Sequence, residues 1–211
     1  MTDRWSAHAQ AYRESEAHRS GGDLDLLVDW ATGRTALDVA TGGGHVARRL
    51  REAGFDVVTV DPAPGMQPDV ISRAEHLPFA DGSFDVVVTR IAPHHFVDVR
   101  EALREMARVS GDLVLIVDNL YRCDVVEEAE RLRDPTHVRN YTEAYWREFF
   151  DQAGLEVEAV ELLETEIDVD AWLARAGCEG DEAERVRTLL ADRIHGGRLG
   201  MTRIALKGRK R

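Results

Sequence analysis

The sequence predicts an α/β fold, in which a doubly wound and mostly parallel sheet carries helices on both faces and ends in an antiparallel strand. Strand-like and helix-like stretches alternate along most of the 211 residues. A strand, a glycine turn and a helix follow one another between residues 35 and 48. Apolar residues make up 44% of the chain, which is enough for the core of one domain.

The chain begins with two expected helices. Residues 5–19 place Trp5 and Tyr12 near one face, and the glycines at 21 and 22 break this helix. Asp23 is expected to cap a second helix at its N-terminus. Both helices precede the first strand, so we expect them to form a lid over the carboxyl edge of the sheet.

The glycine turn follows a short apolar strand at residues 35–40. Gly42 and Gly44 allow positive φ angles and a close approach of the backbone to a ligand, and the next helix starts at His45 and stops at Gly54. The free N–H groups at that helix start favour a ligand above it.

Two classes of ligand fit this turn. Gly42-x-Gly44-x-x-Ala47 matches the dinucleotide fingerprint, and Asp61 lies near its acidic position. S-adenosylmethionine fits the same geometry. Asp38 favours it, because a carboxylate after the first strand suits a ligand with an ammonium and a sulfonium better than a pyrophosphate.

The middle of the chain continues with strands at residues 56–60, 70–72, 84–89 and 112–118. Three prolines fall within residues 62–68, so no normal crossover helix is expected after Asp61. Asp98, followed by Glu101, is expected to cap a helix before the strand at 112–118.

The second half alternates in the same way. A charged helix is expected at 123–133, and Thr142 should cap a helix that buries Trp146, Phe149 and Phe150 and stops at Gly154. A strand at 155–163, helices at 169–176 and 181–194 and a last strand at 199–206 complete the pattern. The basic end, residues 207–211, is expected to be solvated.

Composition excludes several classes of protein. A net charge of −12 and a pI near 5.1 argue against nucleic-acid binding. Cys123 and Cys178 form no redox or metal motif, and His94-His95 has no ligand partner at a suitable spacing, so no metal site is expected. We find no stretch suited to span a membrane and no signal peptide, and we therefore expect a cytoplasmic protein.

An ordered series of motifs carries a family resemblance. The series is Leu37-Asp38-Val39-Ala40-Thr41-Gly42-Gly43-Gly44-His45, Ala74-Glu75-His76-Leu77-Pro78-Phe79, Asp81-Gly82-Ser83-Phe84-Asp85, Ala92-Pro93-His94-His95-Phe96 and residues 131–139. Over nearly its whole length the chain resembles class I S-adenosylmethionine-dependent methyltransferases, in the branch similar to ubiquinone/menaquinone biosynthesis C-methyltransferases. The resemblance implies a Rossmann-like methyltransferase fold and one domain over residues 1–211. Its parts would be an N-terminal lid (1–33), a cofactor-binding half (34–120) and a substrate-side half (121–211).

The resemblance also implies which residues hold S-adenosylmethionine. They are Asp38, Ala40, Gly42 and Gly44 in the glycine motif, Asp61 and Pro62 at the ribose, Ala74 and Glu75 at the adenine, and Arg90 beside the methionine part. Arg73 stands where the family often has Asp, and Arg cannot accept a hydrogen bond from the adenine amino group. The loop after Asp61 is shorter than in the family, so the chain resembles a trimmed member, and the uncovered sheet face suggests a homodimer.

Methyl transfer from a sulfonium is an in-line displacement, so catalysis comes chiefly from placing the acceptor and excluding water. His95 is the candidate base for an acceptor that keeps its proton at neutral pH. Tyr12, His18 and His94 are candidate contacts for a small-molecule acceptor. Arg90 is expected to pair with Asp38 or with an acidic group of the substrate.

Two alternatives stay open at this point. A nicotinamide-dependent oxidoreductase would use the same glycine turn, although Asp38 and the lack of a Tyr-x-x-x-Lys pair argue against it. The second alternative is a non-catalytic relative with weakened cofactor binding. Arg73 at the adenine position and the short loop after Asp61 are the reasons for considering it.

Overall fold

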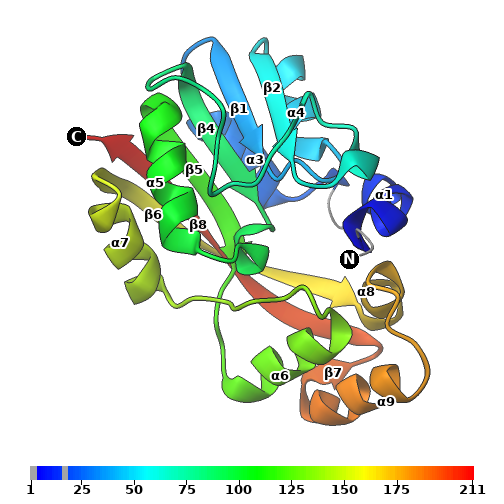
Figure 1. Ribbon diagram of the computed structural model, residues 1–211. Coiled ribbons are helices and arrows are strands. Elements are labelled where there is room, and N and C mark those ends of the chain that lie inside the picture. Colours follow the sequence, from blue (N-terminus) through cyan, green and yellow to red (C-terminus); the bar gives the residue numbers. More distant parts are fainter. Residues whose placement is uncertain (1–3, 16–18) are drawn as a thin grey trace.

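The computed structural model describes residues 4–15 and 19–211 as a twisted sheet with helices on both faces (Figure 1). The strands are β1 (Thr35–Val39), β2 (Asp56–Asp61), β3 (Val70–Ile71), β4 (Phe84–Arg90), β5 (Ser110–Asn119), β6 (Leu155–Asp168), β7 (Ile194–His195) and β8 (Arg198–Lys210). The α-helices are α1 (Arg4–Glu14), α3 (Gly22–Trp30), α4 (His45–Glu52), α5 (Val99–Val109), α6 (Asp124–Arg133), α7 (Glu143–Gln152), α8 (Val169–Arg175) and α9 (Gly180–Leu189). Short 3₁₀ helices are η1 (Pro64–Met66), η2 (Pro93–His95) and η3 (Ala191–Arg193).

The sheet has the strand order β3-β2-β1-β4-β5-β8-β6, and β7 pairs with β8 as a hairpin. The first five strands pair in parallel, while β8 runs antiparallel to both β5 and β6. This order places the carboxyl ends of β1, β2 and β4 next to one another. The predicted fold class is confirmed, including the antiparallel final strand.

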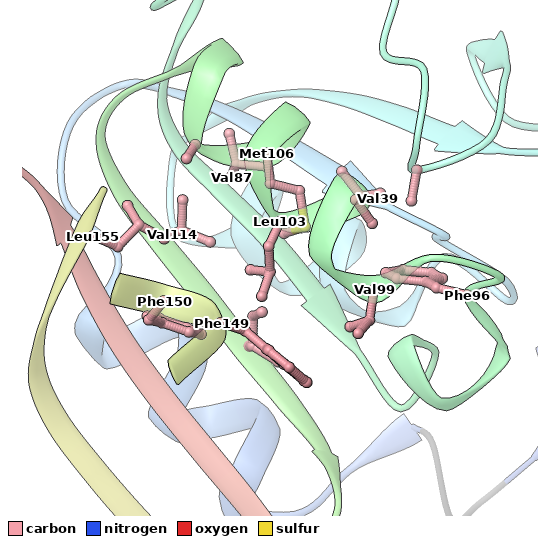
Figure 2. Packing of buried hydrophobic residues seen from close by; sticks show 14 of the residues in the cluster. Val39, Val87, Phe96, Val99, Leu103, Met106, Val114, Phe149, Phe150 and Leu155 are labelled. Carbon is pink, nitrogen blue, oxygen red and sulfur yellow. The ribbon is translucent and has the colours of Figure 1, made fainter. Parts of the chain in front are cut away.

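Helices cover the two faces of the sheet with separate apolar clusters. On one face α5 and α7 pack against the strands, and Figure 2 shows Leu103, Met106, Phe149 and Phe150 meeting strand residues there. On the other face α3 and α4 pack on β1, β4 and β5. A third cluster joins α6, α8 and α9 to the ends of β6 and β8 that extend beyond the parallel strands.

The structure confirms the predicted helix N-caps whose hydrogen-bond partners lie a few residues away along the chain. The Asp98 carboxylate accepts hydrogen bonds from the N–H groups of Arg100 and Glu101 at the start of α5. The Thr142 hydroxyl accepts one from the N–H of Tyr145 at the start of α7. Short strand β3 and the absence of a crossover α-helix between β2 and β3 are also as predicted.

The N-terminal predictions need correction. The first helix ends at Glu14 instead of continuing to residue 19. Asp23 does not cap the second helix: Gly21 is at the N-cap, and Asp23 lies within α3 and is buried. Only α1 lies over the carboxyl edge of the sheet, because the apolar face of α3 is committed to the cluster behind the strands.

The C-terminal boundaries also need correction, because two strands are longer and one helix is shorter than predicted. Strand β6 reaches Asp168, the predicted helix at 181–194 ends at Leu189, and β8 extends to Lys210. The basic end is therefore not a solvated tail. It is a strand between β5 and β6, where a Cβ at Gly208 would lie 2.6 Å from the Phe150 ring.

Candidate active site

An open cavity lies at the carboxyl ends of β1, β2 and β4, with about 890 Å³ of empty space including its mouth. Nine of the predicted site residues line it: Tyr12, Ala40, Gly42, Asp61, Pro62, Ala74, Glu75, Arg90 and His95. Arg73 and Ile91, which belong to the segments expected at the adenine and beside the methionine part, line it as well. Residues without a predicted contact complete the wall: Trp5, Thr41, Gly43, His45, Val46, Met66, Ala92 and Phe96.

Three predicted contacts do not line the cavity, and one cannot be placed. Asp38, Gly44 and His94 are absent from its wall, so a direct contact with a ligand in this cavity is not supported for them. His18 lies outside the described residues.

The glycine turn has the backbone conformation that its composition suggests. Gly42 and Gly44 have φ angles of 50° and 75°, and Ala40 has a φ of 56° although it carries a side chain. Asp38 braces this turn from beneath: its Oδ2 accepts hydrogen bonds from Thr41 Oγ1 at 2.6 Å and from the Ala47 N–H at 3.1 Å. Burial raises the pKa of Asp38 to about 7.

Asp61 connects the glycine turn to the next loop. Its Oδ2 accepts a hydrogen bond from the Gly42 N–H at 3.0 Å, and its Oδ1 accepts one from the Ala63 N–H at 2.9 Å. The side chain is nearly buried and lies on the cavity wall. A carboxylate is thereby held at the point where two parallel strands end.

Helix α1 closes one side of the cavity. The backbone oxygen of Tyr12 lies 3.0 Å from His45 Nε2, and the Ser6 hydroxyl accepts a hydrogen bond from the Gly65 N–H at 2.7 Å. Gly43 is required for this approach, because a Cβ there would lie 2.8 Å from the Tyr12 oxygen. The sequence feature that could have indicated this contact is the presence of a third glycine, Gly43, between the two motif glycines.

The segment expected at the adenine holds an ion pair on the cavity wall. Arg73 Nε lies 3.4 Å from Glu75 Oε2, and Glu75 Oε1 accepts hydrogen bonds from the N–H groups of Val97 and Asp98. The carboxylate of Glu75 thus braces the loop before α5. Ala74, between the two charged residues, also lines the cavity.

Arg90 pairs with Asp23 and not with Asp38, which corrects the sequence prediction. Its Nε and Nη2 donate to the two oxygens of Asp23 at 2.7 and 3.1 Å. Arg203 Nη1 donates to the same carboxylate at 3.0 Å. The pairing unites α3, β4 and β8, elements that are distant along the chain.

His95 is held in one orientation by the loop that follows α6. Its Nδ1 lies 3.0 Å from the Thr136 carbonyl oxygen, and a carbonyl only accepts, so this contact assigns the ring proton to Nδ1. Nε2 then carries the lone pair. Burial and the neighbouring His94 lower the pKa of His95 to about 3, so the ring is neutral at physiological pH. The Trp5 ring lies edge-on at 6.1 Å.

His94 points away from the cavity wall into a buried polar cluster. Its Nδ1 lies 2.5 Å from Asp118 Oδ1, and burial favours the neutral form of both groups, lowering the pKa of His94 and raising that of Asp118. The rings of His94 and His95 lie next to each other, with centroids 4.2 Å apart, but only His95 lines the cavity. Among the described residues, no group of three or more potential ligands is arranged to hold a metal ion. No helix in that part of the chain is long and apolar enough to cross a membrane.

Comparisons with known proteins agree with this geometry. Residues 37–115 match the profile of a family described as "Methyltransferase domain". The chain is 32% identical to the Bacillus subtilis protein described as "Uncharacterized methyltransferase YcgJ", over 88% of this chain and 83% of that protein. The crystal structure of YcgJ superposes with a TM-score of 0.80 at 28% identity, over 90% of this chain and 98% of the other. A demethylmenaquinone methyltransferase of Corynebacterium urealyticum is 37% identical over 39% of this chain and 40% of its own length.

Proposed function

The chain belongs to the class I S-adenosylmethionine-dependent methyltransferases, and on this premise we propose that the cavity beneath α1 holds S-adenosylmethionine together with a small-molecule acceptor. Methyl transfer from S-adenosylmethionine is the activity of the family, which removes the nicotinamide alternative. The observation that carries the proposal is the bond between Gly42 and Asp61 on the wall of a cavity that His95 also lines.

The residues present suit this cofactor. The turn at Ala40 and Gly42 brings backbone to the cavity, and a carboxylate such as Asp61 can accept about four hydrogen bonds, enough for backbone donors and ribose hydroxyls together. At the adenine side Arg73 only donates, so we assign recognition of the adenine edge to the backbone of Ala74 and to Glu75. When bound, S-adenosylmethionine supplies an electrophilic methyl group on a sulfonium.

The protein's own part in the reaction is to position the acceptor and to exclude water. Trp5, Tyr12 and Phe96 supply aromatic walls, and α1 covers the cavity. We assign His95 Nε2 as the base that takes the acceptor proton, since its lone pair is available and the ring is neutral. A pKa of about 3 makes this imidazole a weak base, so the assignment requires an acceptor whose own proton is acidic. Arg90 holds the strand end beside the cavity through Asp23.

We further propose that residues 1–211 act as one methyltransferase domain in the cytoplasm and that two copies associate. The exposed Ile71 supports association, because β3 lies at the edge of the sheet and the short loop after Asp61 forms no α-helix. Static light scattering showing a monomer at tens of micromolar would contradict association.

Calorimetric titration with S-adenosylmethionine and S-adenosylhomocysteine tests the cofactor proposal. Micromolar binding of both, followed by release of S-adenosylhomocysteine in an acceptor screen, is the expected result. The matched pair for the base is His95→Gln against His195→Gln, an exposed histidine on β7. Loss of turnover in the first with unchanged cofactor affinity supports the base assignment. No binding of either compound would favour the non-catalytic alternative.

A further inference from the structure

Four arginines gather below α1, beyond the cavity wall formed by Tyr12 and His95. They come from four elements, and we call them the arginine cluster: Arg90 of β4, Arg133 of α6, Arg175 of α8 and Arg203 of β8. The carboxylates nearest to the cluster are those of Asp23, Glu130 and Asp134. Asp118 also faces Arg203, but burial raises its pKa to about 7.

Each of these carboxylates already has a partner, and of the two Glu130 oxygens Oε1 is buried without a hydrogen-bond partner. Asp23 accepts from both Arg90 and Arg203, as described above. Glu130 Oε2 lies 3.5 Å from Arg133 Nη1, and Arg133 Nε donates to the Trp172 carbonyl at 3.0 Å. The hydroxyl and the N–H of Thr136 both donate to Asp134 Oδ1.

Arg175 is the arginine without a carboxylate. Within the described part of the chain it forms no ion pair, and its one hydrogen bond is from Nη1 to the Ser15 hydroxyl at 3.1 Å. Its Nε is buried and has no hydrogen-bond partner, and the same holds for Arg203 Nε. Burial and the nearby charge of Arg133 lower the pKa of Arg175 to about 10, which shows how poorly this charge is compensated.

A buried guanidinium with unsatisfied N–H donors is costly unless an anion completes it. An unpaired buried polar group costs roughly 1–3 kcal/mol, and more when it is charged. The planar edge of arginine binds two oxygens of a carboxylate or phosphate at once, through Nε and one Nη. The missing partner of Arg175 therefore has a defined chemistry.

Tyr12 connects this cluster to the cavity. Its side chain lines the cavity wall, and it is close enough to Arg133 and Arg175 for their charges to lower its pKa, against the stronger effect of burial that raises it. Arg175 itself bonds to Ser15, one helical turn after Tyr12. Arg175 does not line the cavity itself, so a molecule beside His95 has to extend past Tyr12 to reach it.

We propose that the methyl acceptor carries an oxyanion group, a carboxylate or a phosphate, and that Arg175 binds this group while the accepting atom faces His95. This inference rests on the proposed function of the cavity. Arg203 Nε supplies a second donor, and Tyr12 separates the charged end from the reacting end. The substrate class is then a small organic anion with an apolar or aromatic body, which suits Trp5 and Phe96 on the cavity wall.

The test uses the full-length protein saturated with S-adenosylhomocysteine. Benzoate, phenyl phosphate and neutral benzamide are titrated separately, and binding is followed by calorimetry and by intrinsic tryptophan fluorescence, to which Trp5 on the cavity wall contributes. We expect at least one anion to bind at least about tenfold more tightly than benzamide. Benzoate and phenyl phosphate distinguish a carboxylate site from a phosphate site. Equal affinities, or no saturable binding of either anion, overturn the inference without the need for any variant.

Variants then assign the preference to one residue. Arg175→Gln should abolish the preference for the anion, Arg175→Lys should restore part of it, and Arg185→Gln, at an exposed position of α9, should leave it unchanged. The affinity for S-adenosylhomocysteine should stay within about twofold in all three. An intact preference in Arg175→Gln overturns the assignment. Failure of the wild-type protein to bind S-adenosylhomocysteine would instead refute the proposed function.

Discussion

Replacing Asp61 with alanine removes the carboxylate that joins the glycine turn to the loop after β2. The Gly42 N–H and the Ala63 N–H each lose a charge-assisted hydrogen bond, at 3.0 and 2.9 Å in the intact protein. Gly42 borders the open cavity, so water can replace its partner. Ala63 is fully buried, and its N–H is left unsatisfied at a cost of roughly 1–3 kcal/mol.

The protein should nevertheless remain folded. A loss of about 2–4 kcal/mol for both bonds together is smaller than the 5–15 kcal/mol that typically separates folded from unfolded domains. Cofactor affinity should fall further than stability suggests, because the ribose hydroxyls lose their acceptor and the turn loses its tether. One hydrogen bond to a charged group contributes about 1.5–3 kcal/mol, so Kd should rise at least about tenfold.

Calorimetric titration with S-adenosylhomocysteine measures the affinity, and urea denaturation measures the stability. Asp56→Ala is the matched control, because Asp56 is an exposed carboxylate at the other end of the same strand. Asp61→Asn should fall between wild type and Asp61→Ala, since an amide has one acceptor oxygen for two N–H donors. A folded Asp61→Ala variant that binds S-adenosylhomocysteine within about twofold of wild type would refute the ribose assignment.

The other predictions concern His95, Ala40 and Gly43. His95 is neutral in the folded state down to a pKa of about 3 but takes a proton near pH 6.5 when unfolded, so its contribution to stability is complete above about pH 6.5 and is lost as the pH falls. In urea denaturation at several pH values, wild type should lose about 1.4 kcal/mol per pH unit relative to His95→Gln below that point, and parallel curves would contradict this. Ala40→Gly should raise the free energy of unfolding by about 0.5–1 kcal/mol, because Ala40 has a φ of 56°; a loss of stability would show that this conformation carries no strain. Gly43→Ala should push Tyr12, and α1 with it, away from the glycine turn, because a Cβ there would lie 2.8 Å from the Tyr12 oxygen. S-adenosylhomocysteine binding should weaken by about tenfold and proteolysis of α1 should speed up, whereas Gly22→Ala, with nothing within 4 Å of a new Cβ, should have neither effect. Equal behaviour of the two variants would contradict the close approach.

Much of the fold could be read from short stretches of sequence. The caps at Asp98 and Thr142 satisfy N–H groups within three residues, and the stripe at Trp146, Phe149 and Phe150 is fixed by the helical repeat. The strand–turn–helix around Gly42 likewise depends on neighbours along the chain. The family motifs also led to about half of the residues on the cavity wall, because they mark the carboxyl ends of three adjacent strands.

The buried ion pairs could not be predicted from short stretches of sequence. Asp23 was taken for a helix cap, yet it binds Arg90 and Arg203, which lie 67 and 180 positions away. Each of these residues is common on solvated surfaces, and only the strand order places β8 beside β5 and brings their ends to α3. The same order turns the basic end of the chain into an internal strand.

The sequence by itself determined the element types, the glycine turn, the helix caps at Asp98 and Thr142, and the family, because these depend on contacts within a few residues or on motifs in a set order. Tertiary structure alone decided that His95 and not His94 reaches the cavity, that Asp38 braces the turn from beneath, and that Arg175 is left without a carboxylate. The physical reason is that burial and charge pairing depend on which elements pack together. A side chain's neighbours along the chain do not specify its neighbours in space.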